Sequence, residues 1–227
     1  MQLNGSDITA RMREISMNRK TAFRKFPEIR TERLILRQPS MKDVEWYFEY
    51  FSRPELVWGG GEPGPRDKKA ARREFRKYLV DLYRKRQGFR WIVTLKGQGQ
   101  PIGTLGYYKW LPSASYQAEM GYDLAKEHWR KGVMTEAMNA VLDFGFEKMG
   151  LNRIEVYIMP RNRRPIRMIK SLGFKREGLL RQRYFDELGN YADDILFSML
   201  RSDWESARSK QEGSIHIRCT PHEERSG

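Results

Sequence analysis

A short basic segment, residues 127–137, has the composition of an anion-binding turn. It follows an alternating segment and opens an amphipathic one, which predicts a strand, a turn and a helix in that order. The first N–H groups of a helix have no acceptor within the helix, and the helix dipole adds positive potential, so a pyrophosphate can bind there. Arg130 and Lys131 add charge, and Gly132 leaves room for phosphate to approach the backbone. A solvated helix terminus has the same composition, so both interpretations remain open at this point.

Further segments, in a fixed order, favour the phosphate interpretation. They are residues 31–37 (Thr-Glu-Arg-Leu-Ile-Leu-Arg), 118–124 (Ala-Glu-Met-Gly-Tyr-Asp-Leu), 171–174 (Ser-Leu-Gly-Phe) and 177–182 (Glu-Gly-Leu-Leu-Arg-Gln). With the basic turn in its place among them, the chain resembles the GNAT N-acetyltransferases, whose Q/R-x-x-G-x-G/A loop binds the pyrophosphate of coenzyme A. Within that family it looks most like the Rim-type enzymes, which acetylate the N-termini of ribosomal proteins. The resemblance covers about residues 30–205.

The resemblance implies an acetyl-CoA site. In that family the strand before the turn meets pantetheine through its backbone, which here concerns Tyr122, Asp123 and Leu124. Asn162 matches an asparagine at the mouth of a short helix. The turn that would hold the pyrophosphate consists of Trp129, Arg130, Lys131, Gly132, Val133, Met134 and Thr135. Trp129 stands where Gln or Arg is usual and Met134 where a small residue is usual, but backbone amides can still bind phosphate.

The resemblance also implies a general base. Glu119 matches a strand glutamate that removes the amine proton in several GNAT enzymes, directly or through water; an ion-paired or solvent-facing surface glutamate is the alternative. A general acid is harder to assign, because Ile169 and Pro165 stand where relatives carry Tyr or Ser, and neither can donate a proton. Tyr184 falls where a Rim-type acceptor-site glutamate is expected, so it either donates a proton or shapes the pocket.

Acidity favours an α-amine as the acceptor. About a third of an α-amine is neutral at pH 7.5, against about 0.1 % of a lysine side chain, so one base without an obvious acid suits the α-amine. The leading hypothesis is therefore an acetyl-CoA-dependent N-acetyltransferase acting on protein N-termini. The alternatives are a small-amine or antibiotic N-acetyltransferase, and a catalytically weak acyl-CoA-binding or RNA-associated interaction protein.

Composition restricts the setting of this chemistry. The 227 residues suit one domain at 30–206 between a basic arm at 1–29 and a polar tail at 207–227. The net charge of +14 favours polyanions such as ribosomal RNA as partners, or it keeps a basic surface solvated. There is no apolar run long enough for a membrane span and no secretory signal, so a cytoplasmic location is expected. The protein is expected to be a monomer or a homodimer. Single Cys219 and three scattered histidines predict neither a disulfide nor a metal site.

Periodicity predicts the elements that carry these residues. Alternation predicts strands at 33–38 and 117–124, and β-rich runs on either side of a turn predict strands at 90–95 and 102–110. Further strands are expected at 153–159, 178–185 and 191–200. Helical spacing predicts helices at 44–51, 67–86, 133–149 and 163–172. This order fits the fold that the resemblance implies, which is a mixed α/β GNAT-like fold. Its mostly antiparallel seven-stranded sheet is split between strands four and five. The Gly- and Pro-rich residues 58–65 predict a loop, either an acceptor-selecting one or a passive connector.

Overall fold

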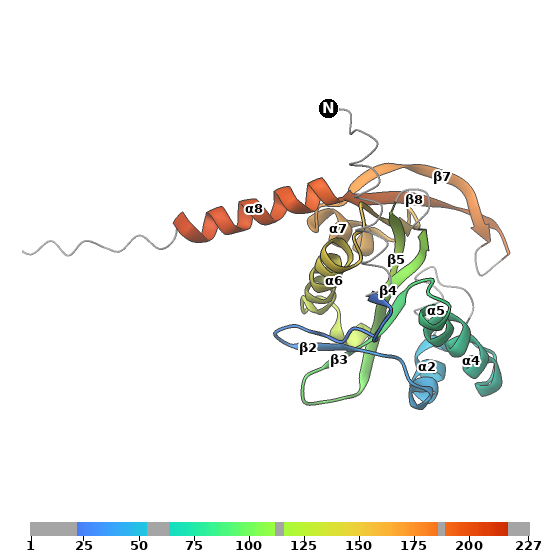
Figure 1. Cartoon of the computed structure of the whole chain (residues 1–227). Coiled ribbons are helices and arrows are strands. Elements are labelled where there is room, and N and C mark those ends of the chain that lie inside the picture. Colours follow the sequence, from blue (N-terminus) through green and yellow to red (C-terminus); the bar gives the residue numbers. More distant parts are fainter. Residues whose placement is uncertain (1–21, 54–63, 112–115, 186–188, 218–227) are drawn as a thin grey trace, which may run out of the picture.

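A single mixed sheet forms the centre of the molecule. The computed structural model describes residues 22–53, 64–111, 116–185 and 189–217. The strands are β1 (Ile29–Arg30), β2 (Leu34–Arg37), β3 (Phe89–Leu95), β4 (Pro101–Leu111), β5 (Gln117–Leu124), β6 (Arg153–Ile158), β7 (Lys175–Phe185) and β8 (Tyr191–Leu200). They lie in the order β1-β2-β3-β4-β5-β6-β8-β7 (Figure 1). The mixed, mostly antiparallel sheet is thereby confirmed, with eight strands because β1 adds to the seven expected.

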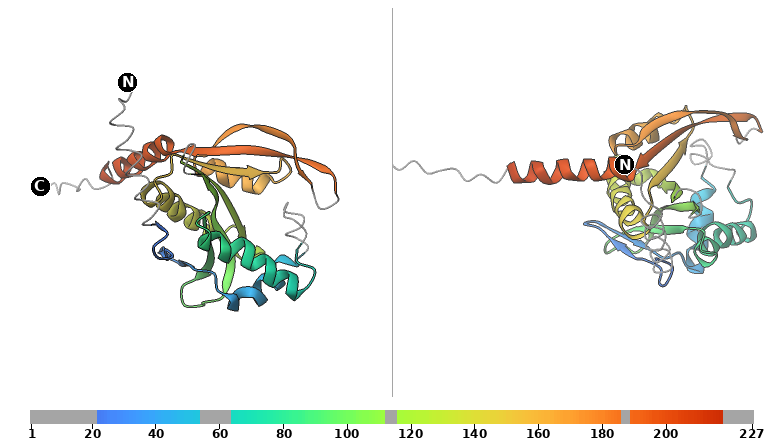
Figure 2. Two further views of the ribbon diagram at one scale, coloured as in Figure 1. Left: turned by 45° about the vertical axis from the view of Figure 1, so that its right-hand side comes forward. Right: turned by 45° about the horizontal axis from the view of Figure 1, so that its top comes forward.

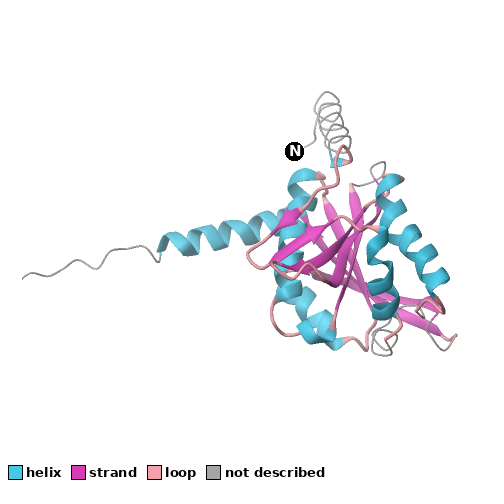
Figure 3. Ribbon diagram, turned by 90° about the horizontal axis from the view of Figure 1, so that it is seen from below, coloured by secondary structure: helices cyan, strands magenta, loops and turns pink. Residues whose placement is uncertain are grey.

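Helices cover both faces of this sheet. They are η1 (Met41–Asp43), α2 (Val44–Phe51), α4 (Lys68–Phe75), η2 (Arg76–Val80), α5 (Asp81–Arg84), η3 (Lys126–His128), α6 (Val133–Asp143), η4 (Phe144–Lys148), α7 (Arg163–Ser171) and α8 (Arg201–Ile217). The helix predicted at 67–86 is the continuous run of α4, η2 and α5. It begins where the side chain of Asp67 accepts a hydrogen bond from the Ala70 N–H at 2.6 Å. Seen from below, the sheet lies between the two helical layers (Figure 3).

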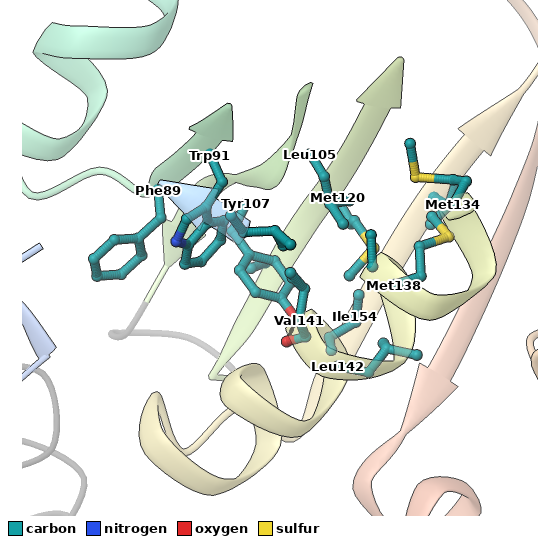
Figure 4. Packing of buried hydrophobic residues seen from close by; sticks show 14 of the residues in the cluster. Phe89, Trp91, Leu105, Tyr107, Met120, Met134, Met138, Val141, Leu142 and Ile154 are labelled. Carbon is teal, nitrogen blue, oxygen red and sulfur yellow. Dashed lines mark hydrogen bonds between the residues drawn. The ribbon is translucent and has the colours of Figure 1, made fainter. Parts of the chain in front are cut away.

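The larger core fills the space between the sheet and α6. Met134 and Met138 of α6 are buried against Met120 of β5 and Ile154 of β6 (Figure 4). These methionines fill the core, since Met138 has no exposed surface. A smaller cluster packs α2 and α4 on the opposite face of the sheet, over β3. The sheet therefore packs a different core on each of its faces.

The predicted split in the sheet is present. Strand β5 pairs in parallel with β6 only where Gln117, Ala118 and Glu119 lie opposite residues 153–155. Beyond Glu119, β6 continues its pairing with β8, while β5 continues its pairing with β4 as far as Leu124. One edge of β5, residues 120–124, is therefore left without a strand partner among the described residues.

Buried side chains lie before the range 30–206, and helix lies after it. Phe23 and Phe26 are buried and contact an aromatic cluster around Phe89, so packing begins before residue 30. Helix α8 continues to Ile217 and projects from the body, away from the β7–β8 hairpin (Figure 2). The predicted loop residues 58–63, together with Cys219 and His222, lie outside the described residues. No helix in the described ranges combines the length and apolar character that a membrane span requires.

Candidate active site

The basic turn opens α6 in the way that the sequence predicts. Gly132 is the N-cap residue with φ of 72°, in the left-handed region that favours glycine. The first hydrogen bond of the helix joins the Glu136 N–H to the Gly132 carbonyl at 3.0 Å, so the amides of residues 133–135 precede it. The side chains of Val133 and Met134 are buried in the core, which leaves their backbone amides as the groups able to meet a phosphate. Met134 therefore does not block the turn.

Two exposed cations lie beside these amides. Arg130 and Lys131 are exposed, and neither side chain pairs with a carboxylate in the part of the chain that the structure describes. Arg130 adopts a φ of 60°, which is uncommon for a residue with a side chain. The turn therefore combines backbone donors at a helix start with two available positive charges, which is the arrangement that binds a pyrophosphate.

The segment around Arg33 holds this turn in place. The Arg33 guanidinium donates to the Lys131 carbonyl at 2.9 Å and to the Glu136 carboxylate at 2.6 Å. Thr31 donates its hydroxyl to the same carboxylate at 2.5 Å. Burial by itself raises the pKa of Glu136, but the hydrogen bonds from Thr31 and Arg33 outweigh it, so the pKa lies below its ordinary value. The ionised Glu136 thus fixes the start of α6 against the chain that precedes β2.

Trp129 has a structural partner that the sequence does not reveal. Its indole N–H donates to the carbonyl of Leu124, the last residue of β5, at 2.6 Å. The Arg164 guanidinium lies over the indole ring, 5.5 Å from its centroid. Because Arg164 belongs to α7 and Asn162 is the N-cap residue of that helix, the start of α7 lies close to the turn. Trp129 therefore ties β5, the turn and α7 together, and its side chain is occupied in doing so.

The unpaired edge of β5 fits an extended ligand that carries amide groups. Asp123 engages Arg90 and Thr104 through its carboxylate, so its side chain lies on the α2 and α4 face. Burial raises the pKa of the Tyr122 phenol, which remains protonated. The groups of this edge that face the split are chiefly backbone N–H and C=O groups. Such groups can pair with the amides of pantetheine. The edge and the turn together suit the two halves of coenzyme A.

Glu119 lies where the pairing of β5 with β6 ends. Its side chain is 24 % exposed and its Oε2 atom accepts a hydrogen bond from the Lys109 Nζ at 2.8 Å. A second cation, Arg183, approaches the same oxygen to 3.9 Å. The carboxylate is thus ion-paired, as one of the two sequence interpretations expected, and it also stands beside the unpaired edge of β5. An exposed ion pair contributes little stability, so the Lys109 side chain can leave the Glu119 carboxylate at little cost.

Arg183 is a site residue that the sequence analysis missed. Its guanidinium donates to Asp194 at 2.7 Å and lies 3.6 Å from the centroid of the Tyr157 ring. Burial raises the pKa of Asp194, although Arg183 opposes the effect. The pairing of β7 with β8 shifts between Leu180 and Tyr184, and no local sequence pattern announces such a shift.

The structure also places two positions, 169 and 184, at which the sequence analysis considered a general acid. Tyr184 lies on β7 opposite Ala192 of β8, and its role as donor or as part of the pocket stays a prediction. Ile169 is fully buried on α7, so the position where relatives carry a tyrosine belongs to the core here.

Comparison with known proteins identifies the family. Residues 33–175 match the family model described as the acetyltransferase (GNAT) domain. The chain belongs to the GNAT acetyltransferases. It is 34% identical over 174 residues to the uncharacterized N-acetyltransferase p20 of Bacillus licheniformis, covering 77% of this chain and 96% of that protein. It is 26% identical over 107 residues to the ribosomal protein uS5-alanine N-acetyltransferase of Escherichia coli, covering 47% of this chain and 55% of that protein.

A solved structure supports the assignment of the fold. Mycobacterium smegmatis RimJ in complex with CoA-disulfide superposes with a TM-score of 0.66 at 21% identity, covering 80% of this chain and 93% of that chain. GNAT enzymes use acetyl-CoA, and the turn and strand edge described above suit that molecule. The GNAT chain is thus an acetyl-CoA-dependent N-acetyltransferase, and its acceptor is the open question.

Proposed function

We propose that this GNAT enzyme acetylates the N-terminal α-amine of a protein. The observation that carries the proposal is the position of Glu119 at the end of the β5–β6 pairing, next to the unpaired strand edge. Similarity to an enzyme named for the alanine of ribosomal protein uS5 supports a protein acceptor of the ribosomal type. Such an acceptor also favours a cytoplasmic location.

The geometry of the site assigns a role in the reaction to each of its parts. Acetyl-CoA supplies the acetyl group as a thioester. The amides of residues 133–135, with Arg130 and Lys131, bind the pyrophosphate, and the edge of β5 orients the pantetheine arm. Glu119 accepts the proton of the attacking amine, directly or through one water molecule. Arg183 lies 3.9 Å from the Glu119 carboxylate and is itself held by Asp194, so it limits the directions from which an amine can approach.

A surface next to Arg183 suits the rest of a peptide. A depression of about 780 Å³ is lined by Leu179, Leu180, Arg181, Gln182, Arg183 and Asp193. Leu179 and Leu180 are 44% and 36% exposed, which provides apolar contact for a side chain, while polar groups lie beside them. A small amine would leave this surface unused, so the depression favours a peptide over a metabolite.

Peptides with a free α-amine are expected to be acetylated at least ten times faster than the same peptides carrying lysine as their only amine. The reason is the neutral fraction near pH 7.5, about a third for the α-amine and about 0.1 % for lysine. Mass spectrometry with fragmentation locates the added acetyl group. Label mainly on lysine side chains, or turnover with small amines alone, would contradict the proposed acceptor.

A basic surface provides a site for a polyanionic partner, such as ribosomal RNA. One side of α4 and η2 packs into the core through Ala71, Phe75 and Leu79. The other side lines a depression of about 360 Å³ with Lys69, Arg72, Arg73, Arg76, Lys77 and Asp81. Lys68 forms an ion pair with a carboxylate. Within the described ranges, no carboxylate pairs with Lys69, Arg72, Arg73 or Arg76. Cations without carboxylate partners on one helix face are what phosphate contacts require.

Reversal of three of these charges tests the surface. The triple variant Arg72→Glu, Arg73→Glu and Arg76→Glu should bind a labelled single-stranded RNA about tenfold more weakly. Its slope of log affinity against log salt should become shallower by about two, since each phosphate contact contributes about 0.7. Fluorescence anisotropy measures both quantities. A control triple at Arg30, Lys96 and Lys148 makes the same change in net charge elsewhere, and equal losses in the two variants would exclude a specific surface.

A further inference from the structure

Lys109 reaches Glu119 against the regular geometry of its strand. In the antiparallel pairing of β4 with β5, Tyr108 lies opposite Glu119, so Tyr108 shares the face of Glu119 and its neighbour should point to the other face. The pairing is irregular between Tyr108 and Leu111, and Lys109 adopts a φ of 44°. A positive φ at a residue with a side chain is unfavourable unless the surroundings require it. This backbone irregularity allows Nζ of Lys109 to lie 2.8 Å from Oε2 of Glu119.

The Lys109 amine therefore occupies the place that the acceptor amine must take. A base that removes a proton from an amine has to lie within hydrogen-bond reach of it, and Lys109 already satisfies that requirement. The same carboxylate borders the unpaired edge of β5, at which the pantetheine arm and its thioester are expected. Lys109 is thus the one lysine that contacts the proposed base among the described residues.

We propose that Lys109 is an internal acetyl acceptor of this enzyme, an inference that rests on the proposed function of Glu119. The nitrogen lone pair of Lys109 attacks the thioester carbonyl carbon, so that an N–C bond forms and the C–S bond breaks. The proton lost by nitrogen passes to Glu119 and then to the departing thiolate, which leaves as the free thiol. The products are acetyl-lysine 109 and coenzyme A, and no oxidant or further reactant is required.

The position of Lys109 at the site offsets the small neutral fraction that an ordinary lysine has near neutral pH. About 0.1 % of a lysine is neutral near pH 7.5, a penalty of about a thousandfold. Well-oriented intramolecular groups reach effective concentrations of about 10⁵ M or more, so an amine held at the site can still react. Acetyl-lysine carries no charge, so the modified residue no longer forms an ion pair with Glu119.

Two other lysines provide matched internal controls. Lys68 pairs with Glu45 at 2.5 Å and its side chain is 66% exposed, and Lys175 pairs with Asp203 at 2.6 Å with 70% exposure. The Lys109 side chain is likewise 66% exposed and ion-paired. Solvent access and ion pairing therefore do not distinguish the three lysines, and only the position beside the split does.

The test is to incubate the full-length protein with isotope-labelled acetyl-CoA and to follow acetylation of each lysine by peptide mapping. Lys109 should be labelled at least ten times faster than Lys68 and Lys175, at a rate per molecule that does not change on dilution of the protein. Acetyl phosphate, a reagent that needs no active site, should label the three lysines at similar rates. Bromoacetyl-CoA should alkylate Lys109, with loss of bromide, which reports proximity to the acyl group independently of acetyl transfer.

Several results would overturn the inference. The inference is wrong if Lys109 is labelled no faster than the two control lysines, or at a rate per molecule that rises with protein concentration. It is also wrong if bromoacetyl-CoA fails to alkylate Lys109, or if the labelling of Lys109 is unchanged in Glu119→Gln. If peptides are acetylated while Lys109 stays unlabelled, the internal acceptor is excluded and the proposed function stands. If acetyl-CoA binds and neither peptides nor Lys109 are labelled, both proposals fail.

Discussion

Gly132→Glu is expected to weaken acetyl-CoA binding by about five- to a thousandfold. A unit negative charge about 4 Å from a phosphate costs about 1 kcal/mol in bulk water and about 4 kcal/mol at the effective dielectric near a protein surface, and 1.4 kcal/mol corresponds to a factor of ten. The new side chain would also start at a position whose nearest heavy atom is Nη2 of Arg33, 3.3 Å away, so it would crowd the group that holds the turn. Isothermal titration calorimetry measures the affinity directly.

Gly97→Glu provides the matched control for this change. Gly97 has a φ of 80°, close to the 72° of Gly132, and lies in open space in the β3–β4 hairpin. The control therefore introduces the same charge and the same backbone strain at a place far from phosphate. Acetyl-CoA should raise the thermal midpoint of Gly97→Glu as it does for the unaltered protein, and should raise that of Gly132→Glu far less. Equal stabilisation of the two variants would show that the turn is not the pyrophosphate site.

Local sequence signals were sufficient for most of the framework. The bounds predicted for β5 and β8 agree with the structure, because loop and turn residues mark the ends of each strand in the sequence. The turn at Gly132 was also predictable, since a glycine between two cations and an amphipathic helix is a local pattern. Such features depend on neighbours in the chain, so reading along the sequence captures them.

Contacts between distant segments were not predictable in this way. Arg33 donates to the Lys131 carbonyl although the two residues are 98 positions apart in the sequence. Phe23 and Phe26 are buried because β3 supplies their aromatic partners, and this contact is likewise absent from the local sequence pattern. The polar sequence after residue 206 concealed the length of α8, which shows little segregation of apolar and polar residues after its contacts at Trp204. Composition alone therefore predicted a tail.

The acceptor side of the site shows the same limit most clearly. Alternation places Tyr108, rather than Lys109, on the face of Glu119, and the irregularity that reverses this arrangement has no local signature. The shift in the pairing of β7 likewise lies beside Arg183, which approaches the Glu119 carboxylate to 3.9 Å and which the sequence did not single out. Irregularities in strands often re-aim side chains next to active sites, so sequence reasoning is expected to fail at such points.

Glu119→Gln is expected to lower turnover of an α-amine peptide by about 10²- to 10⁴-fold, the range typical of general-base catalysis. Glutamine preserves the shape of the side chain and can accept a hydrogen bond, but it cannot take up the proton. Affinity for acetyl-CoA should change little, because the turn lies at the start of α6 and Glu119 lies where β5 and β6 part. Steady-state kinetics with calorimetry separates the two effects.

The pH dependence distinguishes proton removal from positioning. If Glu119 removes the proton, the loss in Glu119→Gln should shrink as the pH rises toward about 9, where an α-amine with an ordinary pKa of about 7.7–8.0 is already mostly neutral. A loss that stays constant with pH would instead indicate that Glu119 positions the amine. Asp203→Asn is the control, because it removes a carboxylate from a comparable lysine ion pair far from the split and should leave turnover unchanged. Near-normal turnover of Glu119→Gln at pH 7 would exclude Glu119 from the mechanism, and with it the base on which acetylation of Lys109 depends.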